Sequence, residues 1–481
     1  MRNKFLLILI ASFSIVADFP ARAQPTQPVI LQPGATITLP TGSSPCAVAV
    51  ADFNADNRAD VAVCEQALNQ VGVFLQTVAA TFPNQSGTYP AGISPSGLMA
   101  VRLTNNTNRP SADLVALSSP SSKWTMLMND GNGQGTFTEL TGVRGFGTNV
   151  PSTNPQLVAG YINRDNYIDF AYTYPAPAQN RVKWDAYAGA GQFSNTSYFE
   201  PFVAPSSLAL DDFDRDGYTD VTFTNTAGNE VWVVYAGVGS NGSPLWGGSS
   251  FVQLASVGQQ PVDVATGDVN YDFRPDLAVA CAGSSFATVF LNTGGPNQFS
   301  SPSTYPLSAP ARKVLFADLN GDTYPELLAV TADNKLQVFQ HTGAPGSTRY
   351  GTPLVLATGV NPTTLQAVDM NGDFVKDIVV GCTGDNTVRI YLNRTLMQPT
   401  ATHVAKLAGI SVCPNPAVGQ LFVRSASETK GPLAATLIDA LGRTVREQEV
   451  QPNTTAIPVA DLPRGLYTLR LIGKEGISTT K

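Results

Sequence analysis

Carboxylates that recur at alternate positions of short loops are the residues of this chain best suited to chemistry. The clearest stretch runs from Asp212 to Asp220 and places aspartates at positions 1, 3, 5 and 9 of nine residues. Side chains at alternate positions of a tightly curled loop point toward one centre, and Ca²⁺ takes about six to eight oxygen ligands from carboxylates, amides and carbonyls. The stretch therefore predicts a structural calcium site.

The same outline returns along the chain, and five copies keep an oxygen ligand at all four places. Aspartate and asparagine also favour ordinary turns, which would explain one such loop but not five with the same spacing. An EF-hand is excluded because it needs flanking helices and an acid at position 12, where Phe223 stands. We predict that Ca²⁺ is bound by Asp52, Asn54, Asp56 and Asp60; Asp212, Asp214, Asp216 and Asp220; Asp268, Asn270, Asp272 and Asp276; Asp318, Asn320, Asp322 and Glu326; and Asp369, Asn371, Asp373 and Asp377.

Two further copies are weaker. The third copy has Tyr161 at position 1, which leaves Asn163, Asp165 and Asp169 as its oxygen ligands. The second copy has the residues from Asn105 to Arg109 where the carboxylates would stand. We expect the third copy to bind metal weakly or not at all, and the second copy is degenerate. The five complete stretches are called the acidic loops and are numbered by their copy: first, fourth, fifth, sixth and seventh.

The acidic loops belong to a longer repeated unit that must position them. Each lies between two apolar runs, and an alternating stretch that ends in an amide follows, as at Gln76, Asn292 and Asn393. Alternation and turns at this spacing predict strands, and four strands in about fifty residues are typical of a β-propeller blade. The acids that close the copies are Asp60, Asp113, Asp169, Asp220, Asp276, Glu326 and Asp377, at separations of 50 to 56 residues.

The two ends of the repeat region favour a closed ring over a solenoid, which is the alternative. The last copy stops after Asn393 without an outer strand, whereas Val29 to Leu39 precede the first copy as an unassigned strand. Swapping this strand into the last unit would close the ring and remove an open sheet edge. We therefore predict an all-β chain with a seven-bladed β-propeller over residues 24–394.

These repeats resemble the FG-GAP/VCBS repeats of the integrin α-chain propeller, which implies Ca²⁺ in loops between the first two strands of several blades. That family favours glycine at loop position 6, which only Gly217 keeps in this chain. The other loops have Asn57, Thr323, Phe273 and Phe374 there. Asparagine tolerates a left-handed backbone better than phenylalanine, so we expect strain in the fifth and seventh loops.

The N-terminus is typical of a secretory signal peptide covering residues 1–23. Arg2 and Lys4 precede an apolar run from Phe5 to Ala17, and Ala21-Arg22-Ala23 offers a cleavage site. A membrane anchor is the alternative, but Asp18 and the residues after it make the run too short to span a bilayer. With no later segment long and apolar enough to cross, we predict a secreted or outer-cell-surface protein after removal of the peptide.

The C-terminal part has a different character. Residues 395–408 are predicted to be a linker, and residues 409–481 a small Ig-like β-sandwich with alternating strands and Gly or Pro turns. One interpretation of this segment is a generic β-sandwich used for binding. The segment resembles the type IX secretion system C-terminal sorting domain through Pro414-Asn415-Pro416-Ala417, Asp439, Gly442-Arg443, Leu462-Pro463, Gly465, Tyr467 and Thr480-Lys481. The resemblance implies the type IX secretion machinery as a partner, although Cys413 replaces the usual aromatic residue and the usual last apolar residues are missing after Lys481.

Charge and cysteine content narrow the remaining possibilities. The net charge of −7 argues against a nucleic-acid partner, and the acidic loops together with the third copy hold 18 of the 36 acids. Cys46 and Cys64 lie on the strands that flank the first loop, so they could form a bridge or remain reduced. Cys281 and Cys382 occupy equal places in separate repeats, which favours buried small hydrophobic residues.

No catalytic motif stands out in the sequence. The two histidines, His341 and His403, are expected to be solvated, and no nucleophile elbow or phosphate loop is found. A paired-carboxylate hydrolase is left open by Glu139, Asp185 and Glu200. We expect a non-catalytic binding or adhesion protein for a protein or glycan ligand; the alternative is an exported carbohydrate-active enzyme on a propeller scaffold.

The four tryptophans offer two interpretations. Trp124, Trp184, Trp232 and Trp246 could be exposed in loops and stack on sugar rings, or they could pack between blades. Packing is favoured for Trp232 because it lies in an alternating strand.

Overall fold

A computed structural model describes most of the repeat region and the strands of the C-terminal part. The chain forms two compact units, residues 23–397 and residues 398–481 together with 1–22. Most of the signal peptide and linker, the second-copy loop from Asn105 to Arg109, and Asp165, Glu200 and His403 lie outside the described residues. The described residues are 8–9, 28–78, 80–103, 111–118, 123–141, 156–163, 167–174, 181–189, 192–199, 205–238, 244–246, 250–294, 299–342, 349–395, 411–418, 420–425, 433–439, 444–450, 453–459, 462 and 466–472.

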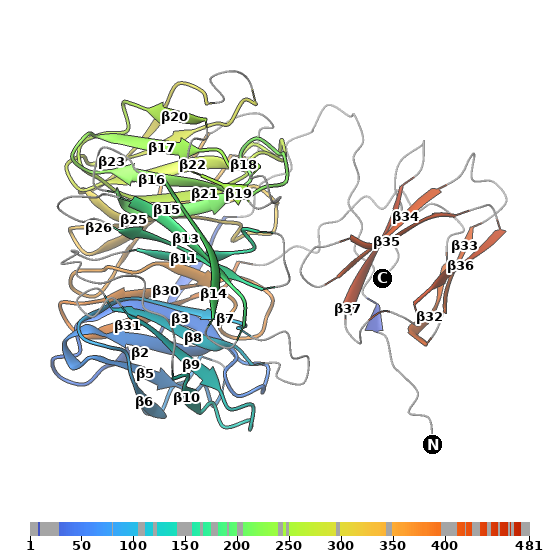
Figure 1. The fold of residues 1–481 in the computed structure, drawn as a ribbon, viewed down its shortest axis with the longest axis horizontal. Helices are drawn as coiled ribbons and strands as arrows, with labels where there is room; N and C mark the ends of the chain where they lie inside the picture. Colours follow the sequence, from blue (N-terminus) through green and yellow to red (C-terminus); the bar gives the residue numbers. More distant parts are fainter. Residues whose placement is uncertain are drawn as a thin grey trace. The chain divides into compact units, whose positions relative to one another are not determined.

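Seven four-stranded antiparallel sheets form the blades of the first unit, which confirms the predicted seven-bladed β-propeller (Figure 1). Blades 1 to 3 consist of β3 (Pro45–Ala51), β4 (Asp60–Glu65), β5 (Gln70–Phe74) and β6 (Gly87–Pro90); β7 (Pro95–Val101), β8 (Asp113–Ser118), β9 (Lys123–Asn129) and β10 (Phe137–Glu139); and β11 (Leu157–Gly160), β12 (Asp169–Tyr174), β13 (Arg181–Tyr187) and β14 (Phe193–Phe199). Blades 4 and 5 consist of β15 (Pro205–Asp211), β16 (Asp220–Asn225), β17 (Glu230–Val234) and β20 (Phe251–Leu254); and β21 (Pro261–Gly267), β22 (Asp276–Cys281), β23 (Phe286–Phe290) and β24 (Ser303–Pro306). Blade 6 consists of β25 (Ala311–Ala317), β26 (Glu326–Thr331), β27 (Lys335–Phe339) and β28 (Leu354–Ala357).

Blade 7 takes its outer strand from the other end of the repeat region. It consists of β29 (Gln366–Val368), β30 (Asp377–Cys382), β31 (Thr387–Asn393) and β2 (Leu31–Thr38). The antiparallel register of β2 on β31 runs from the Leu31–Asn393 pair to the Thr38–Thr387 pair. The predicted strand swap is therefore confirmed.

The apolar runs of the repeat form the second strand of each blade because both faces of that strand are covered. All six residues of β4, β8, β16, β22, β26 and β30 are buried. The outer strands β6, β24 and β28 alternate instead between half-buried and exposed side chains. A continuous apolar run and a period-two alternation are the expected patterns for these two environments.

Seven clusters of buried apolar side chains hold the ring together, each shared by two consecutive blades. The cluster that joins the last blade to the first packs Ile37 and Val379 against Val48 and Val61. Figure 1 shows the orange strands of blade 7 beside the blue strands of blade 1. The solenoid alternative is thus excluded.

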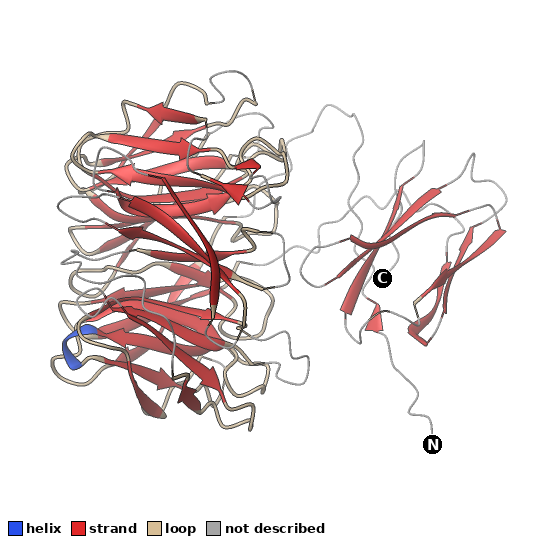
Figure 2. Cartoon of the chain, in the orientation of Figure 1, coloured by secondary structure: helices blue, strands red, loops and turns tan. Residues whose placement is uncertain are grey.

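Helix is nearly absent from the described residues, where Gln66–Leu68 form a single 3₁₀ turn (Figure 2). A short hairpin of β18 (Gly237–Val238) and β19 (Pro244–Leu245) is inserted in blade 4. Within the part of the chain that the structure describes, no helix is long and apolar enough to cross a membrane.

The second unit contains two sheets. β32 (Ser411–Val418), β33 (Gln420–Ser425) and β36 (Asn453–Pro458) form one of them. The other combines β34 (Leu433–Asp439), β35 (Thr444–Val450) and β37 (Leu466–Ile472) with β1 (Ile8–Leu9), which lies inside the predicted signal peptide. The Ig-like arrangement of these sheets and the removal of the signal peptide both stay predictions.

Candidate metal centres

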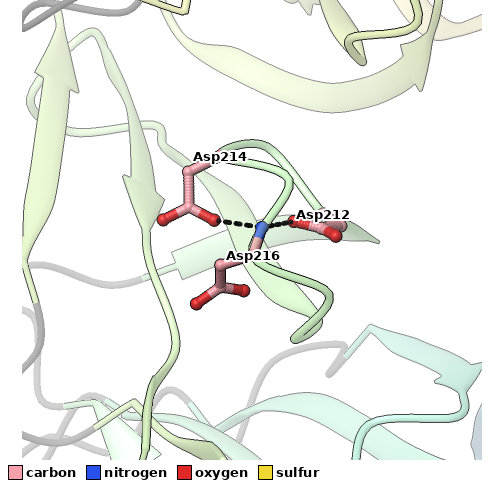
Figure 3. Close-up of side chains that lie close together, drawn as sticks. All are labelled: Asp212, Asp214 and Asp216. Carbon is pink, nitrogen blue, oxygen red and sulfur yellow. Dashed lines mark hydrogen bonds between the residues drawn. The ribbon is translucent and has the colours of Figure 1, made fainter.

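The fourth acidic loop joins β15 to β16 and brings three carboxylates together. One oxygen from each of Asp212, Asp214 and Asp216 lies within 4.8 Å of the other two (Figure 3). Asp212 is half-buried, whereas the other two side chains are exposed. Three converging carboxylates with access to solvent match the hard oxygen donors that Ca²⁺ prefers.

Backbone N–H groups of the same loop turn these side chains inward. The two Asp212 carboxylate oxygens accept hydrogen bonds from the N–H of Asp216 at 3.1 Å and of Gly217 at 2.8 Å. Asp214 Oδ1 accepts from the Asp216 N–H at 3.2 Å, and Asp216 Oδ1 accepts from the Tyr218 N–H at 2.7 Å. The loop sequence thus fixes the direction of its own carboxylates.

The other four acidic loops repeat this hydrogen-bond pattern. In each of them, one oxygen of the position-1 aspartate accepts from the N–H at position 6, at 2.7 to 3.0 Å. The position-5 aspartate accepts from the N–H at position 7 at 2.9 Å in all four. The structure therefore gives the predicted ligands at positions 1, 3 and 5 one common arrangement.

Two positions of every acidic loop have left-handed backbone. At position 6, φ is 62° at Asn57, 82° at Gly217, 65° at Phe273, 75° at Thr323 and 66° at Phe374. Both phenylalanines therefore adopt the strained conformation rather than altering the loop. Position 4 is also left-handed, which we did not expect, with φ of 61° to 79° at Ala55, Arg215, Tyr271, Gly321 and Gly372.

The acid at position 9 has a role that the sequence pattern did not reveal. Asp220 is fully buried, and its two oxygens accept hydrogen bonds from the N–H of Phe213 at 2.8 Å and of Ala236 at 2.7 Å. It therefore clamps the start of the loop to the end of the third strand. Asp113, in the second copy, makes the same pair of bonds to Leu103 at 2.9 Å and Asn129 at 2.8 Å.

The second and third copies keep the position-9 acid although they have lost other loop carboxylates. This retention was the feature of the sequence that could have indicated the clamp. Asp169, in the third copy, likewise accepts from Ile162 and Tyr187 at 3.0 Å. Glu326 differs, because the bonds it accepts from the Leu319 N–H at 2.7 Å and from the Asn320 side chain at 3.2 Å both come from its own loop. Coordination of Ca²⁺ by the position-9 acids stays a prediction in addition to this clamp.

Burial of the position-9 acids disfavours their charged form. Burial raises the pKa of Asp220 and Glu326 to about 8, that of Asp276 to about 7 and that of Asp60 and Asp377 to about 6, against the lowering effect of the backbone donors. The other carboxylates of the same loop raise these pKa values further. A nearby cation would favour the charged form of these carboxylates. The carboxylate and amide oxygens of each loop are the ligands that Ca²⁺ prefers, so they fit this ion.

Amide side chains connect each of four acidic loops to the next blade around the ring. Asn292 Nδ2, at the end of the third strand of blade 5, donates to the Phe213 carbonyl of the fourth loop at 2.7 Å. The amide residues at the ends of the third strands therefore do more than terminate those strands, because they also bind the acidic loop of the neighbouring blade. The equivalent bonds join Asn129 to Phe53 at 2.8 Å, Asn393 to Leu319 at 2.7 Å and Gln76 to Met370 at 2.7 Å.

Replacing Asn292 with alanine is expected to destabilise the propeller by about 1–3 kcal/mol, because the buried Phe213 carbonyl loses its donor. Urea denaturation in Ca²⁺ measures the effect. Asn132→Ala is the matched control, because Asn132 is exposed and bonds to neighbours in its own loop. Equal unfolding midpoints for the two variants would show that the interblade bond contributes nothing.

Several aromatic side chains for which we considered or expected exposure are buried. All four tryptophans are buried, so the stacking of Trp124, Trp184, Trp232 and Trp246 on sugars is wrong and packing within and between blades is correct. The expectation of a solvated His341 is also wrong. Its ring is buried and stacks on Tyr324, with ring centroids 4.9 Å apart.

Three exposed aromatic side chains lie on the acidic loops, in addition to Tyr161 in the third-copy loop and Phe251 on β20. Phe374 is 94% exposed and Phe273 is 59% exposed, both at position 6, and Tyr271 is 43% exposed at position 4. The Tyr271 ring lies 5.4 Å from that of Phe273 and 6.0 Å from that of Tyr324. We call Tyr271, Phe273 and Tyr324 the aromatic strip. The feature of the sequence that could have indicated it is Phe273, which stands at position 6 in place of glycine.

A central cavity of about 560 Å³ lies among the beginnings of the inner strands, at the strand ends away from the acidic loops. Asp263 is the one carboxylate among the described residues that line it. Its Oδ1 accepts from Lys313 Nζ at 2.8 Å and Ser207 Oγ at 2.9 Å, and its Oδ2 accepts from the Val314 N–H at 3.0 Å. This carboxylate is therefore committed to structural bonds.

Comparison with protein families finds two matches. The FG-GAP-like repeat matches residues 268–329 and 318–380, which include the fifth, sixth and seventh acidic loops. The secretion system C-terminal sorting domain matches residues 411–481. No curated protein matches the chain.

Solved structures resemble the chain at low sequence identity. The structure of BBS1N in complex with ARL6DN, soaked with mercury, covers 77% of this chain and 99% of that chain, with a TM-score of 0.52 and 10% identity. A functionally unknown protein from Desulfotomaculum acetoxidans DSM 771 covers 85% of this chain and 98% of that chain, with a TM-score of 0.44 and 10% identity. The first likeness concerns the fold alone.

Proposed function

Because the chain carries FG-GAP-like repeats in a seven-bladed propeller and a secretion-system C-terminal sorting domain, we propose that it is a non-catalytic binding protein stabilised by Ca²⁺. The sorting domain indicates a secreted or cell-surface protein handled by type IX secretion. Outside the cell, calcium is abundant enough for sites with dissociation constants on the order of 10⁻⁴–10⁻³ M.

The observation that carries the calcium proposal is the common geometry of the five acidic loops. In each, position 1 accepts from the N–H at position 6, and positions 4 and 6 are left-handed. The ligands would be the oxygens at positions 1, 3 and 5, with the position-9 acid closing the shell. Bound Ca²⁺ would supply positive charge that offsets the repulsion among these carboxylates.

The aromatic strip supports a binding surface at the acidic-loop end of the propeller. Exposing the Phe273 ring at a left-handed residue costs both backbone strain and apolar hydration, and strain of this kind is retained mainly where it serves function. The flat faces of Tyr271 and Phe273 suit the C–H faces of pyranose rings, and Tyr324 is held in place by His341. We therefore favour a glycan ligand over a protein ligand.

The arrangement of the central cavity supports a non-catalytic role. A glycosidase needs two carboxyl groups on opposite sides of the scissile bond. Asp263 has no second carboxylate among the described residues around the cavity, and it is bonded to Lys313 and Ser207. The exported carbohydrate-active enzyme is therefore the less supported alternative.

A glycan array probed with the mature protein in Ca²⁺ tests the binding proposal. We expect retention of at least one neutral polysaccharide, and its loss in the double variant Tyr271→Ala/Phe273→Asn. A matched control is Phe251→Ala, which removes an exposed ring from the outer strand β20. Equal retention by both variants would place the surface elsewhere, and turnover of any glycan would contradict a non-catalytic function.

Replacing Phe374 with asparagine is expected to stabilise the protein by about 0.5–1 kcal/mol, because asparagine accepts the left-handed φ of 66° and the exposed ring is removed. Urea denaturation in Ca²⁺ measures the change. Phe251→Asn is the control, because Phe251 lies in a strand outside the left-handed positions and its ring stacks on that of Trp232 with centroids 5.0 Å apart, so its replacement should not stabilise the protein. A Phe374→Asn protein no more stable than the wild type would refute the strain at this loop.

A further inference from the structure

Two thiols of blade 1 lie in direct contact. The Sγ atoms of Cys46 and Cys64 are 2.9 Å apart, which is closer than the van der Waals contact of two sulfur atoms. Both cysteines are free thiols in this structure. Cys46 Sγ also lies 3.2 Å from the Pro95 carbonyl oxygen of blade 2.

A β-bulge in the inner strand produces this contact. The pairing of β3 with β4 shifts from Pro45–Glu65 to Ala47–Cys64, so that Cys46 is the extra residue. A bulged residue is left out of the ladder and its side chain is re-aimed. Here the bulge turns the Cys46 side chain onto its neighbour across the strand pair.

Blade 4 has the same bulge with different residues, which shows that the backbone determines the contact. The pairing of β15 with β16 shifts between Pro205 and Leu208, and Ser206 and Thr224 occupy the places of the two cysteines. Their hydroxyl oxygens are 2.7 Å apart. The repeat therefore brings these two side chains together whether they are hydroxyls or thiols.

The two thiols differ in access. Cys46 is half-buried and lines the central cavity, whereas Cys64 is fully buried. Hydrogen bonding to Cys46, together with burial, raises the pKa of the Cys64 thiol well above its usual range. A reagent that enters the cavity therefore meets Cys46 first, and Cys64 is placed to react with whatever Cys46 has bound.

We propose that Cys46 and Cys64 form a disulfide bridge in the exported protein, by exchange with a protein disulfide that serves as oxidant. The Cys46 thiolate attacks one sulfur of the oxidant's disulfide, which forms a mixed disulfide and releases the other sulfur as a thiolate. Cys64 then loses its proton and attacks Cys46 Sγ, which releases the second oxidant sulfur. The two protein thiols are oxidised to one disulfide and the oxidant disulfide is reduced to two thiols.

The bridge would enclose the first acidic loop. Cys46 and Cys64 are 18 residues apart, and Asp52 to Asp60 lie between them. Closing this segment restricts the unfolded chain, which stabilises the folded state. The other buried thiols, Cys281 and Cys382, belong to the clusters of different blade pairs and are not expected to be linked.

Peptide mass spectrometry of the full exported chain, alkylated without reductant after export to an oxidising compartment, tests the proposal. Because Cys64, Cys281 and Cys382 are buried, the chain is denatured during alkylation, and we expect a peptide pair linked through Cys46 and Cys64, with Cys281, Cys382 and Cys413 alkylated. Dithiothreitol should make all five alkylatable and lower the unfolding temperature by about 5 °C. Alkylation of both Cys46 and Cys64 without reductant, or a link from either to Cys413, would overturn the proposal.

The variant Cys46→Ser/Cys64→Thr is the matched control, because it copies the hydrogen-bonded pair found in blade 4. It should fold and show no change in unfolding temperature with dithiothreitol. An equal fall in this variant and in the wild type would also contradict the bridge. The outcome depends on export through the sorting domain but not on calcium or glycan binding, so the two proposals can fail separately.

Discussion

Adding EGTA to the calcium-saturated protein is expected to lower its unfolding temperature by at least about 10 °C. A ligand at 100 times its dissociation constant stabilises the folded state by about 2.7 kcal/mol per site, and five equivalent loops multiply that effect. Removal of the ion by EGTA restores the repulsion among carboxylates such as Asp212, Asp214 and Asp216. Differential scanning calorimetry with and without the chelator measures the shift.

Single-loop variants show whether the acidic loops cause this shift. Asp216→Ala should remove about one fifth of the calcium-dependent stabilisation, because the other four loops are intact. Asn163→Ala is the control, since Tyr161 stands at position 1 of that loop and weakens its ligand set. A calcium-dependent shift that is the same in both variants would place the ion elsewhere, and no shift at all would contradict structural calcium.

Replacing Ile37 with aspartate is expected to destabilise the protein by at least about 4 kcal/mol. Ile37 is 4% exposed in the cluster that joins the last blade to the first, so the substitution loses buried apolar surface and buries a charge without a partner. Because β2 supplies the outer strand of blade 7, its loss would also leave the edge of β31 open to other chains. Urea denaturation and size-exclusion chromatography measure both effects.

Ile30→Asp is the matched control for ring closure. Ile30 precedes β2 by one residue and is 43% exposed, so its substitution should change stability by less than about 0.5 kcal/mol. If Ile37→Asp were as stable and as monomeric as Ile30→Asp, β2 would not be what closes the propeller. If Ile37→Asp unfolded blade 7 alone, calorimetry would show a second unfolding transition for that blade.

The fold could be predicted from the sequence because its signals are local and repeated. The largely apolar second strands, the alternating outer strands and the acidic loops each depend on a few neighbouring residues, and they return about every fifty residues. Ring closure followed from one missing strand after Asn393 and one extra strand before the first copy. These inferences needed no knowledge of long-range packing.

The errors concern properties that depend on distant neighbours. His341 is buried because the rings of Tyr324 and Tyr350 cover it, and that contact joins residues from different parts of blade 6. Trp184 and Trp246 are buried in the cluster between blades 3 and 4 rather than exposed in loops. Spacing along the chain carries no information on which aromatic rings the blades will cover.

The candidate metal centres were predicted in their residues but not in their full role. Alternation of oxygen ligands pointed to positions 1, 3 and 5, which the fourth loop brings together. The clamp of Asp220 onto Phe213 and Ala236 was missed, because it needs the end of the third strand to pass beside the loop. The bulge that joins Cys46 to Cys64 was likewise invisible, since strand pairing alone leaves their register open.

Equilibrium dialysis of the mature protein against millimolar Ca²⁺, followed by elemental analysis, tests the calcium proposal most directly. We expect about five Ca²⁺ per chain, one for each acidic loop. The triple variant Asp212→Ala/Asp214→Ala/Asp216→Ala should bind one ion fewer while its other loops remain filled. Binding of no Ca²⁺ above the dialysis buffer, or an unchanged stoichiometry in the triple variant, would contradict the assignment of these loops as calcium sites.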